Sequence, residues 1–203
     1  MKLHTFPFAP NPTKLEVFLA EKGIEIERVL VSLPKGEQHE PDFVARNPLG
    51  RVPVLELDDG TCVAESLPIM EYLEELHPEP SLIGRTPLER LRIRSLERMI
   101  DTSILGPTAR LVHATRSPLP GVLPSPEMAE ASRSALVRPL EVLDAKVGDG
   151  PFVAGAAVTI ADGTLFAAMR FGGFFGVEVD ARHHNLHRWY AMFSERHGGP
   201  TSV

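Results

Sequence analysis

Alternating hydrophobic and polar positions divide the first third of the chain into short strands and helices. Alternation rich in aromatic and β-branched residues predicts strands over residues 2–8 and 24–33. Between them, Asn11-Pro12 predicts the start of a helix that apolar positions carry as far as Gly23. This order predicts two parallel strands joined by one helical crossover.

The next stretch predicts a hairpin followed by a helix. A turn is predicted at residues 34–37 and a short helix at residues 40–45. Two strands follow, at residues 52–57 and 61–64. The two strands flank residues 58–60, Asp-Asp-Gly, which accept positive φ and favour a tight turn. Helical spacing from Glu65 predicts a helix that ends at His77, before Pro78. The order of elements up to this point is therefore β-α-β-α-β-β-α.

After a proline-rich linker at residues 78–87, the pattern becomes purely helical. Helices are predicted at residues 88–113, at 127–147, from 159 onward and at 185–197. We expect a disturbance of the first helix at Gly106-Pro107 and a kink of the second at Pro139. The chain is therefore expected to hold an α/β domain over residues 1–77 and an all-helical domain over residues 88–203.

Composition and charge narrow the class of protein. Hydrophobic residues make up 43% of the 203 residues, which is enough to fill a core. The net charge of −6 arises before Pro78, where 14 acidic residues stand against 7 basic ones. An acidic chain without a cluster of Lys and Arg is not expected to bind nucleic acid. No apolar run approaches the ~20 residues that cross a bilayer, so no membrane span is expected either.

Cys62 is the single cysteine, which excludes an internal disulfide framework and a cysteine metal cluster. We expect it to be a packed core thiol. A reducing compartment, and the lack of a long apolar core in residues 1–10, predict a cytoplasmic protein. Four histidines lie close together in sequence near the C-terminal end: His183, His184, His187 and His197. They lack a carboxylate partner pattern, so we expect surface residues and no metal site.

Residues 47–66, NPLGRVPVLELDDGTCVAES, concentrate the candidate chemistry. Pro53 lies at the start of a strand, where proline removes a hydrogen-bond donor. A cis Val52-Pro53 bond would free the Val52 backbone to pair with an extended peptide, and a trans proline at a sheet edge is the alternative. Glu65 and Ser66 precede a helix whose free N–H groups favour a carboxylate, while Glu65 can accept from an ammonium. The alternative for Ser66 is a plain helix cap. We call Val52, Pro53, Glu65 and Ser66 the shelf.

The order of elements and three motifs resemble the glutathione transferase superfamily. The motifs are NPLGRVPVLELDDG followed by ES, APNPTKLEVFLAEKGIEIE and FVAGAAVTIADGTLFAA. The resemblance covers essentially the whole chain. It implies a thioredoxin-like first domain of βαβαββα order and an all-helical second domain that contributes the electrophile site. It also implies that Thr159 caps a buried helix and that Asp162 answers it at the N3 position.

The resemblance implies a homodimeric enzyme that binds glutathione as a co-substrate and uses its thiolate to attack a hydrophobic electrophile or a disulfide. Pro53 would be a cis proline, and the Val52 backbone would pair with the cysteinyl part of glutathione. Glu65 and Ser66 would hold the γ-glutamyl head. The candidates for the glycine carboxylate are Lys35, Gln38, His39 and Arg51. An acidic residue, for which Asp101 is the nearest candidate, would reach the γ-glutamyl amine across the dimer.

The turn before the first helix departs from the family pattern. Serine classes read Ser-Pro-Asn there, and residues 9–11 read Ala-Pro-Asn, so the expected hydroxyl is missing. The two tyrosines, Tyr72 and Tyr190, lie elsewhere. Nu-class-like bacterial enzymes use Asn or Thr around this turn, and by that similarity we expect Asn11 to donate to the sulfur, with Thr13 second. The alternatives are that Asn11 merely caps the helix, and that the chain is a glutathione-transferase-like binding protein with weak or no catalysis.

Overall fold

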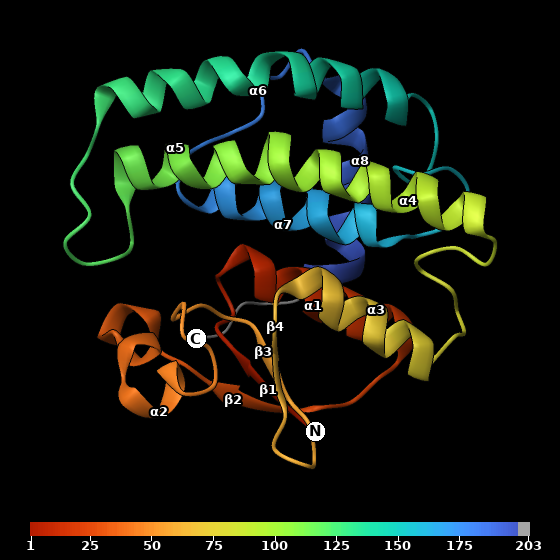
Figure 1. Cartoon of the computed structure of the whole chain (residues 1–203). Helices are drawn as coiled ribbons and strands as arrows, with labels where there is room; N and C mark the ends of the chain where they lie inside the picture. Colours follow the sequence, from red (N-terminus) through yellow and green to blue (C-terminus); the bar gives the residue numbers. More distant parts are fainter. Residues whose placement is uncertain (199–203) are drawn as a thin grey trace. The chain divides into compact units, whose positions relative to one another are not determined.

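The structure is a computed structural model that describes residues 1–198. It divides into two compact units, Met1–Ser81 and Leu82–Val203. Unit 1 combines strands with helices, whereas the described part of unit 2 is built from helices (Figure 1). Within residues 1–198, no helix has both the length and the apolar character needed to cross a membrane.

Unit 1 holds a four-stranded sheet in the order β2-β1-β3-β4. The strands are β1 (Lys2–Thr5), β2 (Glu27–Leu30), β3 (Val54–Glu56) and β4 (Cys62–Ala64). β1 runs parallel to β2 and antiparallel to β3, and β3 is antiparallel to β4. The helices are α1 (Pro10–Lys22), α2 (Pro41–Val44) and α3 (Ser66–Leu76), and 3₁₀ turns occupy Leu33–Lys35 and Glu37–His39. The order of elements predicted from the sequence is confirmed.

The strands are shorter than predicted because their ends belong to neighbouring turns. β1 stops before Pro7, which has no N–H to donate, and the Ala9 N–H closes a turn on the preceding segment. At the start of β2, the Ile24 N–H donates to the Leu19 carbonyl at 2.9 Å. Ile24 therefore belongs to the end of α1, and pairing with β1 begins at Glu27.

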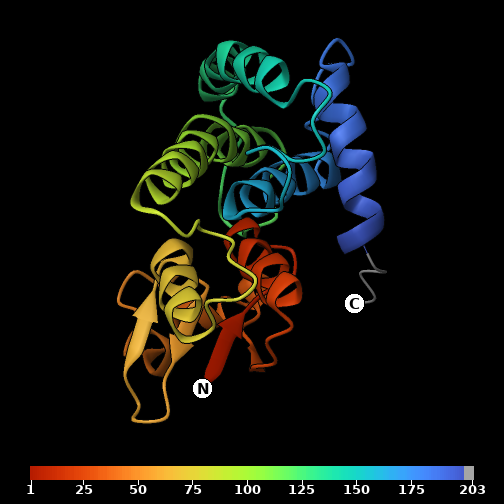
Figure 2. The same cartoon turned by 90° about the vertical axis from the view of Figure 1, so that its right-hand side faces the viewer.

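α1 and α3 lie side by side in unit 1 (Figures 1 and 2), and Lys22 ties their ends together. Its Nζ donates to Glu74 Oε2 at 2.6 Å and to the carbonyls of His77 at 2.6 Å and Pro80 at 2.7 Å. The side chain of Lys22 is 0% exposed and that of Glu74 is 7% exposed. The Ser81 hydroxyl donates to the other Glu74 oxygen at 2.8 Å. This buried network fixes the chain that leaves α3.

The helices of unit 2 are α4 (Pro87–Ile100), α5 (Gly106–Arg116), α6 (Pro126–Val147), α7 (Ile160–Phe174) and α8 (His184–His197). One π-helical turn, Asp101–Leu105, joins α4 to α5, and the combined rod lies between α6 and α7 (Figure 1). The Gly106 N–H donates to the Asp101 carbonyl five residues back, and Pro107 has no N–H to restore the regular spacing. The disturbance expected at Gly106-Pro107 is thus present. α6 continues through Pro139 as one helix.

The start of α7 carries the predicted capping box. The Asp162 carboxylate accepts from the Thr159 N–H at 2.9 Å and the Thr159 hydroxyl at 3.0 Å. It also accepts from the Val153 N–H at 2.8 Å and the Trp189 indole N–H at 3.1 Å. Burial raises the pKa of Asp162, although these donors act in the opposite direction. The carboxylate therefore connects α7, α8 and the loop before α7.

Candidate functional site

The antiparallel pairing of β3 with β4 brings the two halves of the shelf together. Val54 lies opposite Ala64. The residues before β3, Val52-Pro53, therefore lie beside the residues after β4, Glu65-Ser66. Two segments that are separate in sequence therefore lie at the same end of the sheet.

The turn between β1 and α1 reaches the same end of the sheet. β1 pairs antiparallel with β3, with His4 opposite Val54, so the end of β1 lies beside the start of β3. Phe6 and Ala9 of this turn pack against the hydrophobic cluster that contains Val52. The start of α1 is therefore a neighbour of the shelf.

Val52 presents its backbone and buries its side chain. The Val52-Pro53 peptide bond is cis, as predicted. None of the described residues hydrogen-bonds to the N–H or the carbonyl of Val52. The side chain is 8% exposed and packs in a cluster with Val31, Phe43 and Val54. The core thus anchors this residue while its backbone polar groups remain available to an extended ligand.

Glu65 begins α3 in a conformation that is uncommon for a residue other than glycine, with φ 73° and ψ 124°. Its carbonyl accepts the Ile69 N–H at 3.3 Å. Because Pro68 has no N–H, the groups at the helix start without an intrahelical partner are the N–H groups of Ser66 and Leu67. The sequence analysis did not name Leu67 as a binding residue. Pro68 could have indicated it, because a proline near a helix start leaves only the N–H groups before it as free donors.

The Ser66 hydroxyl does not cap the helix. The cap position is Glu65, and no side chain makes a capping hydrogen bond there, so the cap alternative for Ser66 is wrong. Across residues 1–198 the hydroxyl has no hydrogen-bond partner. Polar atoms that lack a partner and are also fully buried do not include it, so its oxygen is accessible to solvent. It therefore reaches the surface, next to the exposed Glu65 carboxylate.

The first turn of α1 leaves the donors of one residue free. The cap residue of α1 is Ala9, so the alternative that Asn11 caps the helix is wrong. The helix starts at Pro10, whose fixed φ suits the first helical position. Pro10 and Pro12 have no N–H, and the Thr13 N–H and hydroxyl both donate to the Ala9 carbonyl, at 3.1 and 3.0 Å. In the described part of the chain, neither the backbone N–H nor the side-chain amide of Asn11 has a partner.

The candidates for the glycine carboxylate lie between β2 and β3. Lys35 and Arg51 are exposed, whereas Gln38 is 7% exposed. The Oε1 of Gln38 is buried without a hydrogen-bond partner among residues 1–198. A Cβ on Gly50 would lie 2.9 Å from the Gln38 carbonyl and 3.0 Å from His39 Nδ1, so the loop before Arg51 packs directly on these two residues.

Asp101 belongs to the π-helical turn of unit 2. Arg98 Nη2 donates to its Oδ2 at 2.7 Å. Unit 1 does not itself bring Asp101 to the shelf, and its role in binding glutathione stays a prediction.

Cys62 is not an activated thiol. It packs against the cluster that contains Val52, and burial, followed by the nearby Glu56 carboxylate, raises the pKa of the thiol. Glu56 accepts from His4 Nε2 at 2.8 Å and from Arg46 Nε at 3.1 Å. These hydrogen bonds hold the pKa of Glu56 below its ordinary value. Cys62 is thus packed, as predicted, but it is only partly buried and lies at the margin of the core.

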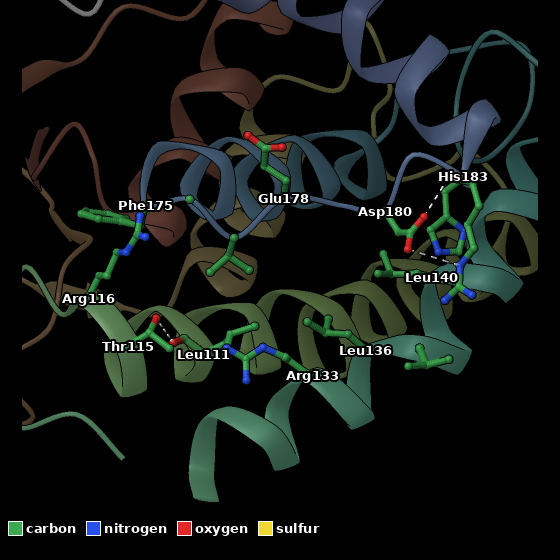
Figure 3. Close-up of a pocket in the computed structure, with 14 residues that line it drawn as sticks. Leu111, Thr115, Arg116, Arg133, Leu136, Leu140, Phe175, Glu178, Asp180 and His183 are labelled. Carbon is green, nitrogen blue, oxygen red and sulfur yellow. Dashed lines mark hydrogen bonds and ion pairs between the residues drawn. The ribbon is translucent and has the colours of Figure 1, made fainter. Parts of the chain in front are cut away.

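The histidines near the C-terminal end differ in burial. His183 is 3% exposed at the start of α8, so the surface position expected for it is wrong. It lines a cavity together with Leu136 and Leu140 of α6 (Figure 3), which accounts for its burial. Among residues 1–198, no group of three or more His, Cys, Asp or Glu side chains is placed to hold a metal ion.

Two family models match the chain. Residues 8–76 match the model described as "Glutathione S-transferase, N-terminal domain", and residues 101–197 match "Glutathione S-transferase, C-terminal domain". The chain is also similar to glutathione S-transferase 2 of Saccharomyces cerevisiae. The two are 32% identical over 204 residues, which cover 97% of this chain and 86% of that protein.

Two solved structures are similar over nearly the whole chain. A glutathione S-transferase domain-containing protein from Marinobacter aquaeolei has a TM-score of 0.90 and 32% identity, covering 97% of this chain and 98% of that one. Gtt2 from Saccharomyces cerevisiae has a TM-score of 0.89 and 33% identity, covering 97% of each. The predicted fold class, a thioredoxin-like part followed by an all-helical part, is confirmed.

Proposed function

The chain belongs to the glutathione S-transferase family, and we propose that it is a glutathione transferase that binds its co-substrate on the shelf. In the proposed reaction, the glutathione sulfur bonds to a hydrophobic electrophile as the leaving group departs, or to one sulfur of a disulfide as the other leaves as a thiolate. The observation that carries the proposal is that the unpaired backbone of Val52 and the free Ser66 hydroxyl lie at one end of the sheet, beside the turn that leads to the free donors of Asn11.

The chemistry of the shelf matches the γ-glutamyl-cysteinyl part of glutathione. The N–H groups of Ser66 and Leu67, with the Ser66 hydroxyl, would bind the α-carboxylate at the positive end of α3. The exposed Glu65 carboxylate would bind the ammonium. The N–H and carbonyl of Val52, held by the adjoining Pro53, would pair with the cysteinyl main chain. The zwitterionic γ-glutamyl head and the cysteinyl peptide unit of glutathione would each contact complementary groups on the shelf.

The glycine carboxylate and the γ-glutamyl ammonium need further partners. Lys35, Gln38, His39 and Arg51 remain the candidates for the carboxylate. The packing of Gly50, the residue before Arg51, on Gln38 and His39 supports the choice of these three. We further propose that Asp101 of a second subunit reaches the ammonium.

Asn11 is the proposed activator of the thiol, with Thr13 second. Lowering a thiol pKa from about 8.5 to near 7 requires about 2 kcal/mol of added stabilisation of the thiolate. A hydrogen bond to a charged group contributes about 1.5–3 kcal/mol. The two free donors of Asn11, at the positive end of α1, are therefore sufficient. The Thr13 hydroxyl already donates to the Ala9 carbonyl.

We also propose a cytoplasmic homodimer. α3 exposes Tyr72 and Leu76, and α4 exposes Leu88 and Leu91, the last with 64% of its surface accessible. Large exposed apolar side chains on two helices suit a protein interface.

Light scattering tests the dimer. The wild-type protein should have the mass of a dimer, and Leu91→Glu should lower the measured mass. A monomeric wild-type protein would contradict the proposed homodimer. The single Cys62 suits a reducing compartment.

Thiolate absorbance of bound glutathione, titrated against pH, tests the catalytic part. We expect a bound-thiol pKa well below the free value, and Asn11→Ala should raise it by about one unit with little loss of binding. Thr13→Val is the matched control: a rise only in this variant would move the role to Thr13. A wild-type thiol that titrates like free glutathione would favour the binding-protein alternative. That alternative is otherwise not favoured, since the relatives are named as transferases and isomerases.

Calorimetry with glutathione tests the shelf itself. Ser66→Ala and Glu65→Gln each remove one charge-assisted contact, so each should weaken binding by about tenfold or more. Glu75→Gln, near the other end of α3, is the matched control and should bind like the wild type. Unchanged affinity in both shelf variants would contradict the assignment.

A further inference from the structure

Asn47 is a buried polar residue in the segment that leads from α2 to Val52. It is 6% exposed. Its backbone N–H donates to the Phe43 carbonyl at 2.9 Å, and Phe43 packs in the same hydrophobic cluster as Val52. The core of unit 1 therefore holds Asn47 in place relative to Val52.

Both polar atoms of the Asn47 side chain hydrogen-bond to the backbone of the turn that follows. Oδ1 accepts the Leu49 N–H at 3.1 Å, and Nδ2 donates to the Arg51 carbonyl at 2.8 Å. The Asn47 carbonyl accepts the Gly50 N–H at 2.9 Å. The first and last of these contacts close the turn, whereas the bond from Nδ2 acts on the peptide unit directly before Val52.

The Arg51 carbonyl and the Val52 N–H belong to one peptide unit. The bond between these residues is trans, and in a planar trans peptide the C=O and the N–H point in opposite directions. Because the Asn47 amide holds the carbonyl, the Val52 N–H points away from Asn47. Among residues 1–198 this N–H has no hydrogen-bond partner. One buried side chain thus sets the direction of a free donor on the shelf.

We propose that Asn47 is a positioning residue that aims the Val52 N–H at the carbonyl of the cysteinyl unit of glutathione. This role rests on the proposed function and concerns the donor half of the Val52 pairing. Without the Asn47 amide, the peptide unit between Arg51 and Val52 is free to rotate. A donor that samples several directions forms a weaker hydrogen bond with the ligand, because alignment is lost and ordering costs entropy. Asn47 acts through Val52 and needs no contact with the ligand.

Two ligands that differ at the cysteinyl carbonyl test this role by calorimetry. γ-Glutamylcysteinamide keeps the carbonyl, whereas γ-glutamylcysteamine has the same γ-glutamyl amide and thiol without it. The wild-type protein should bind γ-glutamylcysteinamide about fivefold more tightly, the effect of one hydrogen bond. Asn47→Asp keeps an acceptor for the Leu49 N–H and removes the donor to Arg51. This variant should lose the preference and keep its affinity for γ-glutamylcysteamine, and Asn47→Ala, which adds no charge, should do the same.

Asp59→Ala is the matched control. Asp59 Oδ1 accepts the Thr61 N–H at 2.9 Å, the same kind of contact that Asn47 makes with Leu49, but it lies in the turn between β3 and β4. This variant should keep the wild-type preference. Hydrogen exchange of the Val52 amide gives an independent measurement. Saturating γ-glutamylcysteinamide should slow this exchange in the wild-type protein, and Asn47→Asp should lose the protection.

Several results would overturn the role of Asn47 alone. They are a wild-type protein that binds both ligands equally, an Asn47→Asp variant that keeps the preference, and one whose Val52 amide is still protected by the ligand. Equal weakening of both ligands in the two Asn47 variants, or loss of the preference in Asp59→Ala, would also overturn it, because general loosening of the turns would then explain the data. A wild-type protein that binds neither ligand would instead overturn the proposed function, and the role of Asn47 with it.

Discussion

Replacing Lys22 with methionine removes a buried cation and keeps a side chain of similar length. In the folded protein, the three donors of the ammonium meet three acceptors, the Glu74 carboxylate and the carbonyls of His77 and Pro80, all within 2.7 Å. The substitution places an uncharged thioether opposite a carboxylate that is only 7% exposed. The Glu74 carboxylate then remains in the interior without the Lys22 ammonium.

The expected loss of stability is about 3 kcal/mol. Removing one partner of a buried ion pair costs about 3–5 kcal/mol, because the other charge stays buried. His77 and Pro80 are exposed, so water can replace the ammonium at their carbonyls, and the lower end of this range applies. Replacing Glu74 with methionine as well should restore most of the loss, because both charges of the buried pair are then removed together.

Hydrogen exchange of the β3 amides measures this effect within unit 1. Val54 and Leu55 are 0% exposed, so their exchange requires opening of the unit. A loss of about 3 kcal/mol corresponds to exchange about 100-fold faster. Lys2→Met is the control, since Lys2 pairs with Glu27 at 3.8 Å on the surface and should change exchange by about twofold at most.

Two results would refute this reasoning. The first is exchange in Lys22→Met within about threefold of the wild-type rate, which would mean that the buried pair contributes less than about 1 kcal/mol. The second is a double variant, with Glu74 also replaced, that exchanges as fast as the single variant. Destabilisation would then come from lost packing and not from the buried charge.

Three further predictions concern single residues. Glu65→Gly should be more stable than Glu65→Ala by about 1 kcal/mol in urea unfolding, because glycine accepts φ 73°; equal stability would contradict strain there. Ionised Glu56 stabilises the fold above its ordinary pKa of 4.5, and this contribution is lost as the pH falls through the lower pKa of the folded state. Glu56→Gln should therefore flatten the acid side of the stability profile, and an unchanged slope would count against the contacts of Glu56. Asp162→Ala should lower the free energy of unfolding by about 3–5 kcal/mol, because buried donors lose their acceptor. Urea unfolding monitored by Trp189 fluorescence measures this loss, and a loss below about 1 kcal/mol would disprove the role of Asp162.

Local signals in the sequence predicted much of the fold. The hairpin followed from residues 58–60, because Asp and Gly suit a tight turn, and the start of α7 followed from Thr159 and Asp162. Each of these features is decided within a few residues of chain. The disturbance at Gly106-Pro107 was visible for the same reason, but its form, a π-helical turn, depends on the Gly106 N–H reaching the Asp101 carbonyl.

Features that depend on several segments were not predictable in this way. The acceptors of Lys22 come from α3 and the chain beyond it, and its side chain alone does not reveal them. His183 looked like a surface residue until the fold buried it. At the site, the motif predicted the shelf residues, whereas the error over the helix cap arose because Asn11 is itself a good capping residue. The role proposed for Asp101 requires a second subunit, which the sequence does not describe.

The missing side-chain cap of α1 has a consequence for the evolution of this site. A capping side chain accepts an N–H from the second or third helical position, and Pro12 at the third has none. A serine hydroxyl at position 9, if it capped the helix, would therefore take the Asn11 N–H. With Ala9, the helix forgoes about 1 kcal/mol of capping and keeps that donor unoccupied. Helix capping and ligand binding would compete for this one hydrogen, and in the described part of the chain it has no acceptor.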